Sequence, residues 1–385
     1  LTGGPISDRP PIDGTKKIAK GAAKELENLH LVTYHLPTGT YKDHGPAFYE
    51  DGGIPTYVNA IAIDKNKNVS ITGGYGFLGK YVRKRLEQRN CKKISDVDHK
   101  KYNLVDIRDV KQMYDDQKPD IVFHAAALKH VPIVEKNPLE GILTNIAGTI
   151  NIAERCKKYN VAEMVLISTD KAVNPFSVMG VTKRISEKYC QGITNKSKTN
   201  FKIVRFGNVL GSTGSVVPLF QKQLEKGGPL TVTHPKMKRY FMTVREAVEL
   251  VIQSATLENK TKKGGIFVLE MGQPIAIIEI AEQLIRLAGL RPNKDIKIKF
   301  TGLRPGEKII EELHYKNEKF LKTKNKSIFI VKPKIESHEK LSKSLKNLID
   351  SAENNKLEEC YRIMSTIVPE YKKTKVENLQ NKRVV

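Results

Sequence analysis

Four consecutive polar side chains follow a short apolar run near the middle of this 385-residue chain. Residues 164–167 are Met-Val-Leu-Ile, which predicts a buried parallel strand, and Ser168, Thr169, Asp170 and Lys171 come directly after it. The carboxyl ends of strands in an open α/β sheet form the edge at which ligands bind. A carboxyl group and an amine at such an edge could donate and accept protons.

A helix is predicted after this polar group. Asn174 and Pro175 interrupt the chain, and Ser177 is suited to cap the N-terminus of the helix. Met179 and Lys183 are four residues apart, so they share one face of that helix. This face would carry one titratable amine and one thioether that cannot exchange a proton at working pH.

A glycine-rich turn lies between a predicted strand, residues 69–72, and an amphipathic helix that runs through Leu86. Glycines at this spacing let the backbone turn tightly, approach a pyrophosphate and pack the helix on the strand. The pattern predicts a dinucleotide site. The residues expected to contact the dinucleotide here are Gly73, Gly76, Phe77, Leu78 and Gly79.

The next two strands supply further candidates for this site. A strand is expected near residues 94–98, where Asp96 and Asp98 would accept from the adenosine ribose and favour NAD. The neighbouring basic residues keep NADP as an alternative; they are Lys92, Lys93, His99 and Lys100. After a strand at 120–123, the small residues Ala125 and Ala126 would let the ribose and nicotinamide lie against the backbone.

The alternation of strands and helices predicts an α/β fold, a Rossmann-like doubly wound parallel sheet with a smaller C-terminal substrate-binding lobe. Another strand is expected at 201–206. Apolar residues at 139, 142, 143, 146, 150 and 153 predict a long helix packed on the sheet, with a structural role.

The sequence Thr169-Asp170-Lys171 matches the active-site triplet of the nucleotide-sugar 4,6-dehydratases that act on UDP-N-acetylglucosamine, which are extended short-chain dehydrogenases. The chain resembles this family over residues 69–313, including 124–132 and 302–308. Met179 stands where the wider family carries the tyrosine of Tyr-x-x-x-Lys. This variant is similar to the branch whose longer members have a membrane-embedded N-terminal part.

The resemblance implies a lyase that removes water from C5 and C6 of the sugar and borrows the C4 hydride, so that a tightly bound NAD, or alternatively NADP, is recycled. Thr169 would then hydrogen-bond the C4 oxygen, Asp170 would protonate the departing C6 hydroxyl, and Lys171 would take the C5 proton. Lys183 would hold the nicotinamide ribose. The C4 hydroxyl proton would leave through Lys183 and a water, or through Asp170.

The resemblance also implies contacts outside the catalytic set. Asn103 and Leu104 match a strand end that contacts adenine, although relatives usually have Asp at the first position. Thr213 stands where relatives often have Arg, and Arg239 or Lys236 could supply that phosphate contact. The residues expected to bind the UDP-sugar are Lys129, Asn208, Thr231, Arg239 and Glu307.

We expect three segments: an N-terminal extension of unknown role at 1–66, a catalytic unit at 67–315, and a lysine-rich C-terminal appendage at 316–385. Within the catalytic unit, the dinucleotide part would be mainly 67–205. The substrate lobe would be mainly 206–242 and 271–315.

The formal net charge is +24, which we interpret as a solvated lysine-rich surface and not as a specific nucleic-acid site. The 4 cysteines are isolated, which indicates neither a metal site nor a disulfide framework and favours the cytoplasm. No apolar run is long enough to span a bilayer in the chain as given, which is expected to be soluble. The chain begins at Leu1, so an upstream membrane segment stays open. A homo-oligomer is expected.

Three other functions stay open. Another nucleotide-sugar epimerase or epimerase-reductase would fit the glycine turn but not the triplet. A catalytically inactive NAD-binding scaffold would fit Met179. A nucleic-acid-binding protein would fit the charge, and its binding would depend on salt.

Overall fold

The computed structural model describes residues 67–91, 93–97, 100–257, 264–316, 318–331 and 337–371. It also describes the backbone of two antiparallel strands, β1 (His30–His35) and β2 (Thr40–Pro46). Apart from these two strands, the expected extension at 1–66 lies outside the described residues.

The chain forms two compact units. The larger unit comprises the described parts of Thr56–Ser212, Arg239–Pro274 and Leu303–Val385. The smaller unit comprises the described parts of Leu1–Pro55 together with Thr213–Lys238 and Ile275–Gly302.

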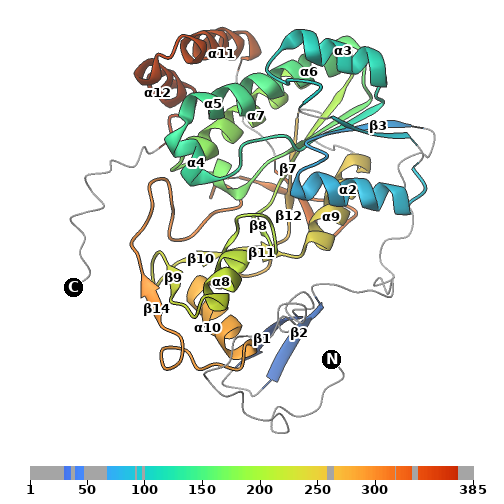
Figure 1. Ribbon diagram of the computed structural model, residues 1–385. Coiled ribbons are helices and arrows are strands. Elements are labelled where there is room, and N and C mark those ends of the chain that lie inside the picture. Colours follow the sequence, from blue (N-terminus) through green and yellow to red (C-terminus); the bar gives the residue numbers. More distant parts are fainter. Residues whose placement is uncertain are drawn as a thin grey trace. The chain divides into compact units, whose positions relative to one another are not determined.

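An eight-stranded sheet forms the centre of the larger unit (Figure 1). Its strands lie in the order β15-β16-β12-β7-β6-β5-β3-β4. The strands from β4 to β12 are parallel, and β16 and β15 are antiparallel to their neighbours. This arrangement confirms the Rossmann-like α/β fold. In chain order the strands are β3 (Asn68–Thr72), β4 (Lys93–Val97), β5 (Ile121–His124), β6 (Glu163–Ile167), β7 (Asn200–Arg205), β12 (Ile266–Leu269), β15 (Phe320–Lys322) and β16 (Ile328–Val331).

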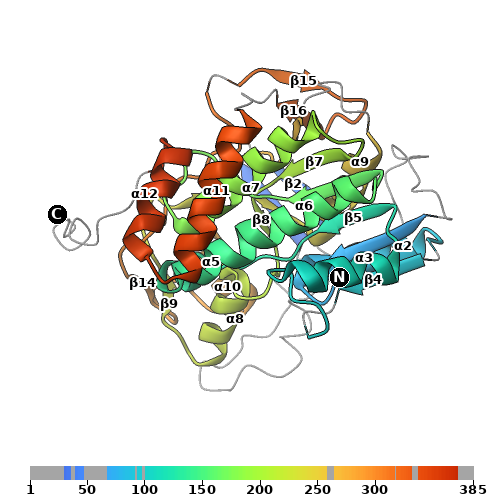
Figure 2. The same ribbon diagram turned by 90° about the horizontal axis from the view of Figure 1, so that it is seen from above.

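Helices cover both faces of this sheet because its strands are apolar on both sides. In β6, Met164 and Leu166 pack into the core on one face, and Val165 packs into the core on the other. The first face is covered by α3 (Ile107–Gln117), α4 (Val131–Lys136), α5 (Pro138–Ile142), α6 (Gly148–Lys158), α7 (Val178–Thr194), α11 (His338–Glu353) and α12 (Leu357–Ile367) (Figure 2). The opposite face is covered by α2 (Phe77–Gln88) and α9 (Val244–Thr256).

The strand order reverses at β3, which pairs with β4 on one side and β5 on the other. The connections that follow β3 and β5 therefore leave the sheet on opposite faces and open a crevice at the carboxyl ends of these two strands. The glycine turn follows β3, and Ala125 and Ala126 follow β5. The fold thus brings both predicted dinucleotide segments to one crevice.

The expected long helix is not a continuous α-helix. A π-helical turn, η3 (Leu143–Ala147), lies between α5 and α6. Asn145 in this turn is buried, and it bonds to Leu128 and to Thr182 on α7. Its side chain fixes the segment after β5 relative to the helix that carries Lys183.

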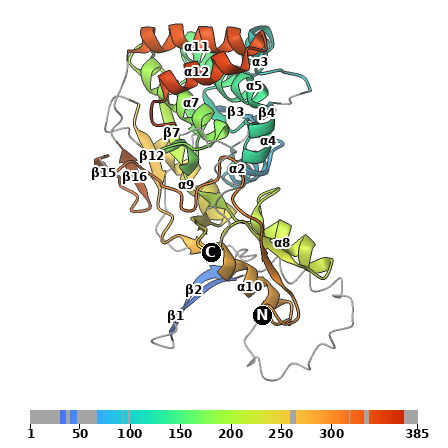
Figure 3. The ribbon, with the colours of Figure 1, turned by 90° about the vertical axis from the view of Figure 1, so that its left-hand side faces the viewer.

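The lysine-rich C-terminal segment contributes to the core of the larger unit. β16 pairs with β12, and Ile328 and Ile330 are fully buried. Helices α11 and α12 lie side by side against α5, and they place Leu345, Leu348 and Met364 in the core (Figure 3). The part of this segment that is described is therefore integral to the Rossmann-like unit.

The smaller unit pairs β9 (Leu230–Val232) with β14 (Ile298–Phe300) in parallel. Its helices are α8 (Val216–Glu225) and α10 (Ile277–Leu287), and α10 packs against α8 and β9. The short strand β13 (Ile275–Ala276) precedes α10.

The larger unit contains two more short parallel strands, β8 (Asn208–Val209) and β11 (Phe241–Met242). The chain passes from the smaller unit to the larger one within the short strand β10 (Lys238–Arg239).

Within the described ranges, no helix has the length and apolar character needed to cross a bilayer. The cysteines at positions 91, 156, 190 and 360 are buried free thiols.

Candidate active site

The glycine turn packs directly against the segment that follows β5. Gly73 has a φ of +71°, and a Cβ atom added there would lie 2.8 Å from the main-chain nitrogen of Ala126. A Cβ atom at Gly79 would lie 2.2 Å from the carbonyl oxygen of Gly73. Because no side chain fits at either position, the turn and the start of α2 form a close backbone cradle.

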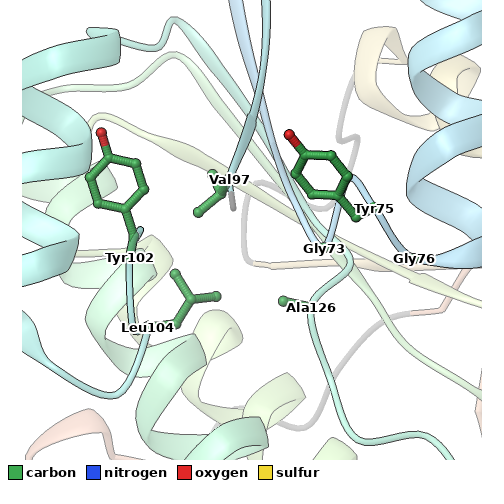
Figure 4. Close-up of a pocket in the computed structure, with 7 residues that line it drawn as sticks. All are labelled: Gly73, Tyr75, Gly76, Val97, Tyr102, Leu104 and Ala126. Carbon is green, nitrogen blue, oxygen red and sulfur yellow. The ribbon is translucent and has the colours of Figure 1, made fainter. Parts of the chain in front are cut away.

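A cavity of about 110 Å³ opens beside this cradle (Figure 4). Its lining is Gly73, Tyr75, Gly76, Val97, Tyr102, Leu104 and Ala126. Tyr75 and Tyr102 were not singled out in the sequence, since an isolated tyrosine in a loop carries no spacing signal. Phe77 and Leu78 lie in the first turn of α2 and pack against the core of the adjacent sheet face. Ala125 donates its main-chain N–H to the carbonyl oxygen of Thr72.

Asp96 lies under the glycine turn, where a Cβ atom at Gly74 would be 2.2 Å from its Oδ1 atom. Its Oδ2 atom pairs with Arg83 of α2. Its Oδ1 atom is buried and has no hydrogen-bond partner in the described part of the chain. An unpaired acceptor beside a side-chain-free cradle fits the ribose and pyrophosphate of a dinucleotide. Asp98 lies outside the described residues.

Asn103 begins a turn and does not end a strand, so the expected strand end is corrected, and the adenine contact expected of Asn103 and Leu104 stays a prediction. Its Oδ1 atom accepts from the main-chain N–H of Val105 at 3.0 Å, and Asp106 caps α3. Asn151 bonds to the carbonyl oxygens of Leu104 and Val105 and fixes this turn from α6. The local hydrogen bonds of Asn103 favour a turn over an extended strand.

The predicted catalytic triplet begins at the carboxyl end of β6. Thr169 caps a short 3₁₀ helix, η4 (Asp170–Ala172), and its hydroxyl donates to Asp170 Oδ1 at 2.8 Å. Asp170 is fully buried. A Cβ atom at Gly180 would lie 2.3 Å from the carbonyl oxygen of Lys171, so α7 starts in direct contact with the triplet.

Lys171 connects Asp170 to Asn208. Its Nζ atom donates to Asp170 Oδ1 at 2.9 Å and to Asn208 Oδ1 at 3.1 Å. Its side chain is 20% exposed, so it can reach a ligand, whereas Asp170 Oδ2 is buried without a hydrogen-bond partner among the described residues. The structure therefore places an amine and a carboxyl group in direct contact, in a position where a proton can pass between them.

Lys183 and Met179 lie on the face of α7 that points into the protein. Lys183 Nζ donates to the carbonyl oxygen of Ile167 at 3.0 Å. Burial lowers the pKa of Lys183 to about 8, and the negative charge of Glu187 only partly opposes this. Met179 is 3% exposed and packs in the hydrophobic core. Ser177 caps α7 as predicted and accepts from the main-chain N–H of Gly180.

A buried histidine, His124, connects β3 to α6 beside the crevice. His124 contacts Thr72 Oγ1 through Nδ1 at 2.6 Å and Thr149 Oγ1 through Nε2 at 3.0 Å. The hydroxyl of Thr149 donates to the carbonyl oxygen of Asn145, so it accepts from His124, which places the histidine proton on Nε2. Burial and, to a smaller extent, the charge of Lys183 lower the pKa of His124 to about 3. His124 is therefore a neutral link between β3 and α6.

A buried ion pair fixes the end of β6 to α7. Arg205 donates to both carboxylate oxygens of Glu187, at 3.0 and 2.6 Å, and Ser168 donates to Glu187 Oε1 at 2.6 Å. Burial acts to raise the pKa of Glu187, but Arg205 and then Arg184 outweigh it and the pKa is lowered. Ser168 precedes the triplet, and Glu187 is one helical turn beyond Lys183. The bonds of Glu187 to Ser168 and Arg205 therefore help to fix the position of Lys183 relative to the triplet.

The residues expected to bind the UDP-sugar differ in their burial and in their contacts within the protein. Lys129 lies over the ring of Phe77, and burial lowers the pKa of Lys129. Arg239 is buried and donates to the carbonyl oxygens of Lys308 and Ile309. Glu307 accepts from the main-chain N–H of Arg304.

Asn208 contacts Lys171, as described above. Thr231 lies in β9 of the smaller unit, where Gln223 donates to its hydroxyl. The structure thus brings Asn208 to the triplet, and the ligand contacts expected of Lys129, Thr231, Arg239 and Glu307 stay predictions. A further carboxylate, Glu311, lies 3.9 Å from Arg239 and was missed in the sequence.

The chain is similar to known proteins in sequence and in structure. A family model described as "Polysaccharide biosynthesis protein" matches residues 100–333. The capsular polysaccharide biosynthesis protein CapD of Staphylococcus aureus is 45% identical over 278 residues, which are 66% of this chain and 46% of CapD. The chain therefore spans about half the length of this relative.

Two shorter relatives have more specific names. The UDP-N-acetylglucosamine 4,6-dehydratase (inverting) of Campylobacter jejuni is 32% identical over 291 residues, covering 70% of this chain and 84% of the relative. A UDP-glucose 4-epimerase of Rickettsia bellii is 36% identical over 272 residues, which are 64% of this chain and 77% of the relative. The solved structure of Pen from Bacillus thuringiensis is 31% identical, with a TM-score of 0.62 over 71% of this chain and 89% of Pen.

Proposed function

Because this chain belongs to the polysaccharide biosynthesis protein family, we propose that it is a nucleotide-sugar 4,6-dehydratase that acts on UDP-N-acetylglucosamine in surface polysaccharide or glycan synthesis. The observation that carries the proposal is the hydrogen-bonded pair of Asp170 and Lys171 at the carboxyl edge of the sheet. An elimination needs a base for the carbon acid and an acid for the leaving group, and this pair can supply both.

The two side chains act in opposite directions on the sugar. Once C4 is a ketone, Lys171 takes the C5 proton and the electron pair of that bond forms the C5–C6 double bond. The C6–O bond breaks, and the departing hydroxyl takes a proton from Asp170 and leaves as water. Lys171 later returns its proton to C5 while the hydride taken from C4 adds to C6. The proton released from the C4 hydroxyl, which Lys183 receives through a water, then restores Asp170.

The pair must begin with its proton on Asp170 and a neutral amine on Lys171. Moving one proton along their 2.9 Å hydrogen bond converts the ion pair into this form without any exchange with solvent. Thr169 would donate to the C4 oxygen, and its hydroxyl already lies 2.8 Å from Asp170 Oδ1.

A nicotinamide dinucleotide, NAD or NADP, would accept the C4 hydride and return it to the sugar. The fitting groups are the cradle of Gly73, Gly76 and Gly79 and the unpaired Asp96 Oδ1 atom. Lys183 would hold the nicotinamide ribose and, through a water, receive the C4 hydroxyl proton. Met179 would fill space beside the ring, because a thioether cannot take a proton.

The UDP-sugar would be held by Lys129, Asn208, Thr231, Arg239 and Glu307. We also propose the division into an N-terminal extension, a catalytic unit from 67 to 315 and a C-terminal segment whose described part packs into that unit, together with assembly into a homo-oligomer.

A 4-epimerase is the alternative that the Rickettsia relative favours. The two reactions are separated by one incubation of the protein with UDP-N-acetylglucosamine and catalytic NAD, followed by mass spectrometry. A dehydratase yields a product lighter by one water, with a 4-keto group that hydrazine traps. An epimerase yields an isomer of unchanged mass. An intact substrate with bound dinucleotide would favour an inactive scaffold.

A further inference from the structure

Tyr75 is an exposed tyrosine in the glycine turn that none of the roles above uses. The main-chain N–H of Gly76 donates to the carbonyl oxygen of Gly73, and Tyr75 lies in the turn that this bond closes. Tyr75 is 56% exposed. A single exposed tyrosine is ordinary on a protein surface, but this one also lines the cavity beside the turn. Its place on the cavity points to contact with a ligand.

A second aromatic ring lies across the same cavity. Tyr102 is 3% exposed, and its hydroxyl donates to Asp116 Oδ2 at 2.6 Å. The rings of Tyr75 and Tyr102 lie on opposite sides of the cavity (Figure 4). One aromatic wall is therefore buried and held by a hydrogen bond, and the other is open to solvent.

The rest of the lining is apolar. Val97 from the end of β4 and Leu104 contribute aliphatic side chains, and no residue with a charged side chain lines the cavity within the described ranges. A phosphate placed here would lose its solvation and gain no charged partner from these residues. A flat ring system fits such a lining, because aromatic rings favour stacked or edge contacts.

Asp96 indicates which part of a dinucleotide lies here. It precedes Val97 in β4, and its unpaired Oδ1 atom lies beside Gly74, next to Tyr75 in the chain. An acidic residue at this strand end binds the adenosine ribose. The adenine is bonded directly to that ribose, so it must lie close to Asp96. β4 is on the opposite side of β3 from β6, which leads to the catalytic triplet, so the cavity is at the adenine end of the site.

We propose that Tyr75 stacks on the adenine of the bound dinucleotide and closes the cavity over it, which slows the release of the dinucleotide. Stacking of a base on an aromatic side chain changes Kd by about fivefold to 100-fold. The inference deepens the proposed function, because it concerns the dinucleotide of the same site. It does not depend on the reaction of the sugar.

The first measurement is residue-resolved hydroxyl-radical labelling, read by mass spectrometry, of protein from which bound dinucleotide has been removed with charcoal. The probe is ADP-ribose, which carries the adenine but no nicotinamide. A stacked base covers one of the two ring faces, so saturating ADP-ribose should lower the labelling of Tyr75 by about twofold or more. Tyr81 is the internal control, because it is exposed on α2 and does not line the cavity, and its labelling should not change. Unchanged labelling of Tyr75 with ADP-ribose bound overturns the proposal.

The second measurement compares variants by the Kd of ADP-ribose and by the release rate of reduced dinucleotide. The release rate is followed by the loss of dinucleotide fluorescence after mixing with excess ADP-ribose. Tyr75→Ser should raise both values by about fivefold to 100-fold, whereas Tyr75→Phe keeps the ring and should stay near the parent. Tyr81→Ser is the matched control, because it removes an exposed ring from the adjacent helix, and it should leave both values unchanged.

Parent values in Tyr75→Ser, or an equal change in Tyr81→Ser, overturn the proposal. A Tyr75→Phe protein as weak as Tyr75→Ser also overturns it, because the hydroxyl and not the ring would then hold the ligand. If Tyr75→Ser releases dinucleotide faster but the parent gives no dehydration, the proposed dehydration fails and the role of Tyr75 stands. If the parent binds neither dinucleotide nor ADP-ribose, both fail.

Discussion

The Nζ atom of Lys183 lies 3.0 Å from the main-chain carbonyl oxygen of Ile167, the last residue of β6. This bond fixes the amine immediately before the catalytic triplet. A buried lysine that donates to a carbonyl oxygen keeps two further N–H bonds for a ribose or a water.

Lys183 and Met179 should differ sharply in their response to substitution. Lys183→Ala should lower kcat by about 100-fold or more, because it removes the group that we propose transfers a proton and holds the ribose. Met179→Leu should keep most of the activity, since leucine fills a similar volume in the core. Steady-state kinetics of the two variants tests this, with circular dichroism to verify folding. A Met179→Leu protein as inactive as Lys183→Ala would show that the thioether has a role of its own.

Activity should increase with pH toward about 8 if Lys183 receives the C4 hydroxyl proton. The pKa of Lys183 is lowered by burial to about 8, so the neutral amine becomes the main form as the pH rises through that value. The measurement is kcat/KM for the free enzyme between about pH 6 and 9. Lys183→Arg should lack this rise because a guanidinium stays protonated. A flat parent profile would assign Lys183 to ribose binding alone.

Asp170→Asn and Lys171→Met should each lower kcat by about 10²-fold to 10⁴-fold, as expected for a removed general acid or base. Dinucleotide binding should persist in both, because neither side chain lines the cavity beside the glycine turn. Turnover assays combined with release and quantification of bound NAD and NADP would test this. Normal turnover in either variant would reassign the roles.

Gly180→Ala should disturb the site, whereas Gly148→Ala should not. A methyl group at Gly180 would lie 2.3 Å from the carbonyl oxygen of Lys171, but at Gly148 the nearest atom is 3.6 Å away. Overpacking of this kind costs about 1–3 kcal/mol, so Gly180→Ala should lower both Tm and kcat. Gly148→Ala should be neutral or stabilise by up to about 1 kcal/mol. Thermal unfolding of both variants tests this. Equal Tm values would contradict the close packing of Gly180 against Lys171.

Asp96→Asn should shift the preference from NAD toward NADP. The substitution removes a carboxylate that a 2′-phosphate would face, and it releases Arg83 from its partner. The ratio of the two Kd values should change by about tenfold or more, because opposing like charges at an interface costs upward of about a kcal/mol. Isothermal titration with each dinucleotide measures the ratio. An unchanged ratio would show that Asp96 does not face the adenosine ribose.

The sequence alone was sufficient to predict the parallel strands and the glycine turn, because in each case an apolar run ends in a sharp change of residue type. The strands at β3, β5, β6 and β7 lie within one or two residues of the expected positions. The turn at Asn103 was not predicted, since its side-chain bond to Val105 has no periodic signal. Neither was the π-turn at Asn145, because apolar spacing alone does not distinguish it from a regular helix.

The candidate site was predictable where residues follow one another along the chain, as in Thr169, Asp170 and Lys171. It was not predictable where the partners are distant in sequence. The segment 308–312 contacts the chain just after the triplet through Lys308 and Asn174, and these contacts depend on the tertiary fold. Contacts between residues so far apart in the chain leave no pattern in a single sequence.

The antiparallel pairing of β16 with β12 affects how the protein folds during its synthesis on the ribosome. β12 leaves the ribosome long before β16, so one edge of the growing sheet stays unpaired during the intervening synthesis. At about 5–20 residues per second, this interval is roughly several seconds. During it the apolar edge of β12 can pair with strands of other nascent chains. We therefore expect slower translation of the stretch between β12 and β16, or crowded polysomes, to reduce the yield of native protein.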